Sequence, residues 1–231
     1  MLKSFKDEIY QIAPPWVLRP FLVRLAPASS PFLPQFLEKR LIFIHVPKAA
    51  GSSLKTSLYG KRGGGHRRIA EFMAYDPQKT HAFFKCAFVR NPWDRLLSAY
   101  SYLRQGNGTN RRDKTFTETY LDPHPSFENF VLSLQVRSYR KAVMAYDHFR
   151  PQTYWLCLPG QKDHAMDFIG RFERMQTDLE TLTERLNLPG GALEVGRTSQ
   201  HRPYRQEYTK KTRRIVADHY ADDIALFGYE F

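Results

Sequence analysis

The chain has 231 residues, a length that suits one domain with a sizeable hydrophobic core. Its hydrophobic content of 42% excludes a disordered chain, and no apolar run reaches the ~18 residues of a membrane span. The net charge of +12 favours an anionic ligand without selecting among nucleic acid, acidic glycan and nucleotide. The two cysteines, Cys86 and Cys157, are predicted to be buried thiols rather than parts of a disulfide framework or a metal site.

The N-terminal segment carries an acidic pair and several prolines where a signal peptide needs an unbroken apolar core. We therefore expect a cytoplasmic protein without a transmembrane segment. Residues 1–40 are predicted to form an extension that is part of, or packed on, a single domain at residues 41–231. The apolar stretch at residues 15–37 is a candidate for peripheral contact with a membrane or a partner.

The first strand-loop-helix unit begins with LIFIHV at residues 41–46, a nearly continuous apolar run typical of a buried parallel strand. The segment SSLKTSLY that follows the next loop is predicted to be helical. N–H groups at a helix start bind phosphate or sulfate, Gly51 allows close approach of the backbone, and Lys48 adds charge. The Lys precedes the glycine, unlike the order of the mononucleotide P-loop, which disfavours NTP hydrolysis. An ordinary turn with a solvated Lys is the alternative for this segment taken alone.

The second unit begins with the strand FFKCAFV at residues 83–89. Its helix has Asn91 as N-cap, Pro92 at the first position and Asp94 where a capping-box acid belongs. Arg90 leaves the strand end and Ser98 lies eight residues further on. An Arg fork and a hydroxyl at the same sheet edge suit a second phosphate, and a surface salt bridge is the alternative role for Arg90.

The remainder of the chain is predicted to contain a surface loop at residues 104–115 and helices near 126–136, 176–187 and 210–226. Strands that alternate with helices indicate an open, mostly parallel sheet covered on both faces. Such sheets bind ligands at the carboxyl ends of their strands, which is where the loops after Val46 and Val89 lie.

The segment FIHVPKAAGSSL, residues 43–54, resembles the 5'-phosphosulfate loop of sulfotransferases that use 3'-phosphoadenosine 5'-phosphosulfate (PAPS). The segment FVRNPWDRLLSAY, residues 88–100, resembles their 3'-phosphate-binding segment. The likeness is closest to carbohydrate sulfotransferases and their bacterial relatives. It continues through IGRFERMQTDLETL and YADDIALFGYEF, and thus runs from about Leu41 to Phe231.

This resemblance implies an α/β fold like that of P-loop NTPases, with three layers and a central, mostly parallel sheet flanked by helices. It also implies an enzyme that moves a sulfuryl group from PAPS to a hydroxyl of a carbohydrate or glycoconjugate by in-line displacement, without a metal. Lys48 would stabilise the leaving oxygen. The predicted donor-binding residues are Pro47, Lys48, Ala49, Ala50, Gly51, Ser52, Ser53, Arg90, Ser98, Arg202 and Tyr204.

Three further assignments remain open in the sequence. His66 is the favoured catalytic base over His81, which we expect at the start of a strand, although His66 also fits a solvated loop beside a glycine run. Arg202 and Tyr204 are expected to close over the nucleotide, or else belong to a basic solvated face. Arg104, Arg111 and Arg112 are candidate contacts to an acidic or extended saccharide, or are simply solvated.

Two other functions compete with sulfuryl transfer. A kinase-like phosphotransferase would use similar sheet geometry, but the chain lacks its Gly-Lys-Ser/Thr metal corner. A nucleic-acid-binding module would explain the charge, but no zinc-finger or RRM signature accompanies it, and we expect no nucleic-acid partner.

Overall fold

The computed structural model describes residues 27–60, 65–108, 110–188 and 202–231. Three parallel strands form its centre in the order β1 (Leu41–Ile44), β2 (Phe84–Val89), β3 (Phe168–Arg171). All four residues of β1 and the last five of β2 are buried, so both faces of these strands are covered. The near-continuous apolar runs arise from this double burial. The predicted α/β fold with a parallel sheet is confirmed.

Strand β3 is not evident in the sequence because it is short and only half-buried apart from Gly170. It pairs with β2 in the register Cys86↔Phe168 and Phe88↔Gly170. A Cβ on Gly170 would lie 2.4 Å from an atom of the Phe88 ring, so packing against that ring requires a glycine.

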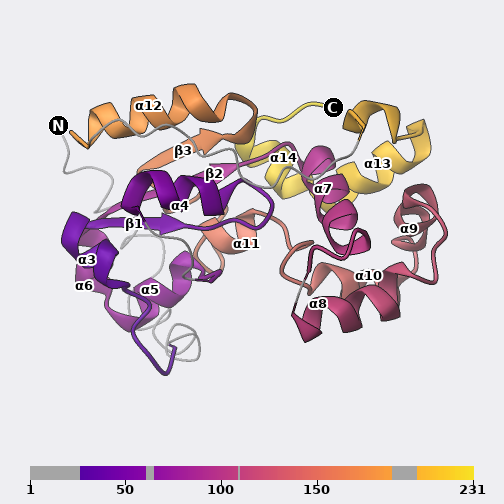
Figure 1. Ribbon diagram of the computed structural model, residues 1–231, viewed down its shortest axis with the longest axis horizontal. Coiled ribbons are helices and arrows are strands. Elements are labelled where there is room, and N and C mark those ends of the chain that lie inside the picture. Colours follow the sequence, from indigo (N-terminus) through magenta and orange to yellow (C-terminus); the bar gives the residue numbers. More distant parts are fainter. Residues whose placement is uncertain (1–26, 61–64, 109, 189–201) are drawn as a thin grey trace.

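Helices flank the sheet (Figure 1). They are α3 (Pro34–Lys39), α4 (Gly51–Tyr59), α5 (Ile69–Tyr75), α6 (Pro77–Ala82), α11 (Thr153–Leu156) and α12 (Met175–Arg185), with the short 3-10 turn η2 (Phe172–Arg174) before α12. Phe32 and Phe36, from the segment before β1, belong to the core that these helices form with the sheet. The division into an N-terminal extension and a single domain stays a prediction.

A second hydrophobic core lies among helices to one side of the sheet (Figure 1). Its elements are α7 (Pro92–Arg104), α8 (Arg111–Phe116), the π-helical turn η1 (Thr117–Leu121), α9 (Phe127–Ser133), α10 (Arg137–Met144) and α13 (Lys210–His219). The chain ends after the 3-10 turn η3 (Tyr204–Gln206), α13 and α14 (Ala221–Phe227). Helix α7 links the two cores because it begins at the carboxyl end of β2 and buries its apolar stripe in the second one.

Three sequence-based expectations are wrong in detail. His81 lies on α6 rather than a strand, because Asp76 accepts the Lys79 N–H as N-cap and Pro77 begins a helix. The expected surface loop at 104–115 contains α8, whose N-cap is Asn110. The single helix expected at 210–226 is interrupted at Tyr220, which separates α13 from α14.

Two other expectations can be compared with the described residues. Cys86 and Cys157 are buried free thiols, as predicted. Within the described ranges, every helix is too short or too polar to cross a bilayer.

Candidate active site

The loop after β1 has an unusual backbone geometry. Lys48 and Ala50 both adopt left-handed conformations, with φ of 68° and 57°. Non-glycine residues rarely adopt this conformation, and those that do cluster at functional sites. Ala50 precedes α4, and no side chain caps that helix among the described residues. The first N–H groups of α4 therefore point out of its positive end, and turns of this kind form concave anion sites.

Gly51 is required by a contact within the protein. A Cβ at this position would lie 1.8 Å from an atom of the His45 ring, so only glycine lets α4 begin against that side chain. We predicted that this glycine gives the backbone close approach to an anion. The structure adds an independent reason for a glycine here, because the His45 ring occupies the space where a Cβ would lie.

Lys48 extends from this loop toward α7. Its Nζ lies 3.9 Å from the centre of the Tyr102 ring, a cation–π contact. Burial, together with the positive charge of Arg90, lowers the pKa of Lys48 to about 8, while the charge of Asp113 acts in the opposite direction. A partly desolvated cation beside a second cation is an environment that a bound anion would stabilise.

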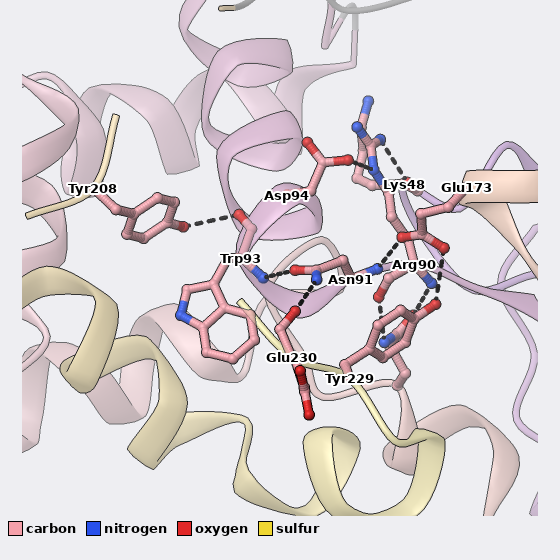
Figure 2. Close-up of polar contacts among 10 residues, drawn as sticks. Lys48, Arg90, Asn91, Trp93, Asp94, Glu173, Tyr208, Tyr229 and Glu230 are labelled. Carbon is pink, nitrogen blue, oxygen red and sulfur yellow. Dashed lines mark hydrogen bonds and ion pairs between the residues drawn. The ribbon is translucent and has the colours of Figure 1, made fainter. Parts of the chain in front are cut away.

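Arg90 joins the two predicted phosphate segments (Figure 2). Its Nε donates to Asp94 Oδ2 at 2.7 Å and its Nη1 donates to the Lys48 carbonyl at 3.1 Å. The guanidinium carbon lies 3.9 Å from the centre of the Phe172 ring. These contacts hold the guanidinium between α7 and the loop at residues 45–50, which is predicted to bind the sulfate donor and is called the donor loop below, with only 6% of the residue exposed.

The backbone of Arg90 is held just as firmly. Its N–H donates to Gln152 Oε1 and its carbonyl accepts from Gln152 Nε2, both at 2.9 Å. Gln152 and Thr153 in turn donate their N–H groups to the buried carboxylate of Asp223. A side-chain amide thus supplies the donor and acceptor that a neighbouring strand would otherwise provide.

The start of α7 is fixed by distant segments (Figure 2). Asn91 accepts the Trp93 N–H as N-cap, donates its own N–H to Glu173, and donates its amide to the Glu230 carbonyl at 2.8 Å. Ser98, predicted to bind the 3'-phosphate with Arg90, lies further along α7 and is 1% exposed. Both predicted residues are therefore on elements that leave the carboxyl end of β2.

His66 lies beside the donor loop, with a defined tautomer. Its Nδ1 is 3.0 Å from the His45 carbonyl, and because a carbonyl only accepts, Nδ1 carries the proton and the lone pair of the neutral ring is on Nε2. Burial lowers the pKa of His66, partly offset by that hydrogen bond, so the neutral form is favoured. Lys55 of α4 donates to the Gly65 carbonyl and positions the segment. His81, by contrast, precedes β2, at the opposite end of the strand from Arg90.

A buried cluster around Asp113 completes the site and was missed from the sequence. The Tyr146 hydroxyl donates to Asp113, and His148 Nε2 lies 3.6 Å from the same carboxylate. The His148 ring is 6.3 Å from that of His66 and 5.4 Å from that of Tyr102, measured between ring centres. The pattern Asn110-x-x-Asp113 was the available signal, since it is a helix start with an acid at the third position.

An open groove of ≈ 760 Å³ lies on the other side of this cluster. Its lining consists of Arg111, Arg112, Thr115, Phe116, Thr119, Tyr120 and Tyr146. Two of the three arginines predicted to contact the acceptor therefore line it. Arg104 instead forms an ion pair with Asp122 at 2.5 Å.

Arg202 and Tyr204 lie before α13. Arg202 is exposed, while the Tyr204 ring packs 5.5 Å from the Phe231 ring. Phe231 packs in turn 5.4 Å from Trp93, the second residue of α7. Tyr204 is thus placed near the start of α7, and its role over the nucleotide stays a prediction.

Comparison with known families matches residues 37–230 to the sulfotransferase family. The chain belongs to this family. A similar curated protein is carbohydrate sulfotransferase 14 of Danio rerio, 27% identical over 241 residues, an alignment that covers 83% of this chain and 60% of the relative. The chain therefore spans less than two thirds of that relative's length. No solved structure matches this chain. The three-stranded parallel sheet flanked by helices agrees with the P-loop-like fold that family membership implies.

Proposed function

We propose that this protein transfers a sulfuryl group from PAPS to a hydroxyl of a carbohydrate or glycoconjugate. The observation that carries the proposal is that Lys48 and Arg90 lie close together at one edge of the sheet. These residues are 42 positions apart in sequence and are joined by the hydrogen bond from Arg90 to the Lys48 carbonyl. Two cations at the carboxyl ends of adjacent parallel strands suit a ligand with two separated anionic groups.

The donor would be held at both of its anionic ends. The N–H groups at the start of α4, with the hydroxyls of Ser52 and Ser53, would bind the 5'-phosphosulfate, and Arg90 with Ser98 would bind the 3'-phosphate. The desolvated amine of Lys48 fits this ligand because a neighbouring anion would restore its preference for the charged form. Its charge would then stabilise the oxygen that leaves sulfur during in-line displacement.

His66 is the proposed base for the acceptor hydroxyl. Its lowered pKa keeps the ring neutral near neutral pH, and the Nε2 lone pair can then accept a proton. The proton lost by the hydroxyl would move to Nε2 as the oxygen attacks sulfur, and the bond from sulfur to the phosphate oxygen would break. The imidazolium formed would be stabilised by the His45 carbonyl at Nδ1.

The groove beside Asp113 is the proposed acceptor site. Of its aromatic side chains, Tyr120 is partly exposed and could pack on a sugar ring, while Arg111 and Arg112 favour acidic groups. The resemblance to a carbohydrate sulfotransferase supports the same class of acceptor.

The decisive experiment is transfer of radiolabelled sulfate from PAPS to a panel of neutral and uronic-acid-containing oligosaccharides, combined with calorimetric titration of 3'-phosphoadenosine 5'-phosphate (PAP). We expect tight PAP binding without magnesium and label in at least one saccharide. Binding of ATP with magnesium in preference to PAP would refute the proposal in favour of a phosphotransferase.

A further inference from the structure

Asp113 is an immobilised and nearly buried carboxylate between two functional regions. It is 4% exposed and lies on α8, the helix that the sequence did not reveal. Its own N–H donates to Asn110 Oδ1, and Asn110 Nδ2 donates to its Oδ2 at 2.7 Å. The Tyr146 hydroxyl donates to Oδ1. A buried carboxylate with this many donors is fixed in the ionised form.

One neighbouring side chain connects the carboxylate to the groove, and others connect it to the donor loop. Tyr146 lines the groove directly. On the other side, His148 Nε2 lies 3.6 Å from Asp113 Oδ1, and its ring packs 5.4 Å from Tyr102. Tyr102 in turn carries the Lys48 amine over its face at 3.9 Å. Asp113, His148, Tyr102 and Lys48 are therefore in a continuous series of contacts.

We propose that Asp113 is a positioning residue for the transfer reaction, one that anchors Tyr146 and His148 beside the acceptor groove and supplies the negative charge that balances Lys48. This inference rests on the proposed function for the role of Lys48. It assigns to Asp113 a task that requires its charge, whereas a purely structural residue would need only its shape and hydrogen bonds.

The charges around Lys48 determine the sign of the expected effect. Arg90 at the end of β2 and burial disfavour the ammonium, Asp113 on α8 favours it, and His45 at the end of β1 is kept neutral by burial. Asp94 on α7 is already paired with Arg90. Asp113→Asn keeps the side-chain shape but removes the charge, so the pKa of Lys48 should fall below its value of about 8.

The consequence is a defect that depends on pH. If the pKa of Lys48 falls by about one unit, its charged fraction at about pH 8 drops from about one half to about one tenth, a roughly fivefold loss. At about pH 6.5 Lys48 stays mostly charged in both forms. The ratio of wild-type to variant kcat/KM for PAPS, which reports the free enzyme, should therefore grow about fourfold between these two pH values. A change in folding or packing alone would reduce kcat/KM by the same factor at both.

The test compares the full wild-type chain with Asp113→Asn and with a matched control, Asp218→Asn. Asp218 is an exposed acid on α13. Acetic anhydride labelling of Lys48 against pH, read by peptide mass spectrometry, measures its titration without any turnover. We expect the labelling midpoint to move to lower pH by at least about half a unit in Asp113→Asn only. PAP binding should be retained.

Each outcome separates this inference from the proposed function. An unchanged labelling midpoint, or a loss of kcat/KM that is independent of pH, overturns the role of Asp113. A wild-type protein that binds no PAP and transfers no sulfate refutes the proposed function, and the role of Asp113 in the reaction with it, whatever the labelling shows. If Asp113→Asn melts much lower than wild type, Tyr146→Phe tests the anchoring separately. It should lower kcat about threefold with the Lys48 midpoint unmoved, and full activity in that variant contradicts the anchoring.

Discussion

Replacing Arg90 with Ala should weaken the binding of PAP far more than that of AMP. The guanidinium is already oriented by Asp94, Phe172 and the Lys48 carbonyl, so a 3'-phosphate would gain a charge-assisted hydrogen bond without ordering the side chain. Such a bond contributes about 1.5–3 kcal/mol, which corresponds to a roughly 10- to 150-fold increase in Kd for PAP. AMP, which lacks that phosphate, should change by less than about threefold.

PAP and AMP should each be titrated calorimetrically into the wild type and into Arg90→Ala. The four dissociation constants make a thermodynamic cycle, which isolates the coupling between Arg90 and the 3'-phosphate. Arg174→Ala is the matched control, because Arg174 is an exposed arginine in an i,i+4 pair with Asp178. An equal loss for PAP and AMP would refute the reasoning. It would mean that Arg90 acts through its hydrogen bond to the Lys48 carbonyl, by shaping the 5' loop, rather than on the 3'-phosphate.

Three further predictions concern the donor loop and its surroundings. Lys48→Met should lower kcat about 10²- to 10³-fold. It should also remove the alkaline limb expected near the Lys48 pKa of about 8 in the pH profile of kcat/KM for sulfate transfer. His66→Asn should lower kcat at least about 10²-fold. In wild type, activity should fall with acid only below pH 6.5, because burial lowers the His66 pKa and the neutral form is the base. A pH profile that is the same in His66→Asn as in wild type would exclude His66 as the base. Gly51→Ala should cost about 1–3 kcal/mol by forcing a Cβ into the His45 ring, seen as a melting temperature lower by about 2–12 °C. Ala50→Gly at the neighbouring position, whose φ of 57° suits glycine, should not reproduce that loss.

The parts of the fold that could be predicted are those encoded by local pattern. Strand β1 and strand β2 are short apolar runs buried on both faces, and α7 combines an N-cap, a proline at its first position and a regular apolar stripe. The relation between Lys48 and Arg90 was also predictable, because the carboxyl ends of parallel strands meet at one sheet edge.

The parts that escaped prediction depend on distant partners. Helix α8 is rich in charge, and its core contact is Phe116, which stacks on Tyr146 with ring centres 3.9 Å apart. The apolar periodicity of residues 210–226 continues through Tyr220, but that residue interrupts the helix while its hydroxyl donates to the Phe149 carbonyl at 2.6 Å. Asp113 was hidden for the same reason, because its partners Tyr146 and His148 are more than thirty positions away.

The hydrogen bonds that fix the segment after β2 also determine when this segment can reach its final structure during synthesis of the chain. Asp223 holds Gln152 across 71 positions, and Asn91 reaches the Glu230 carbonyl across 139 positions. At about 5–20 residues per second, a ribosome needs about 7–28 seconds to synthesise the chain between Asn91 and Glu230. A nascent chain therefore carries both predicted phosphate-binding segments long before it contains the residues that fix them. Its ability to bind the proposed nucleotide should appear only after Glu230 has been synthesised, as a late step in folding.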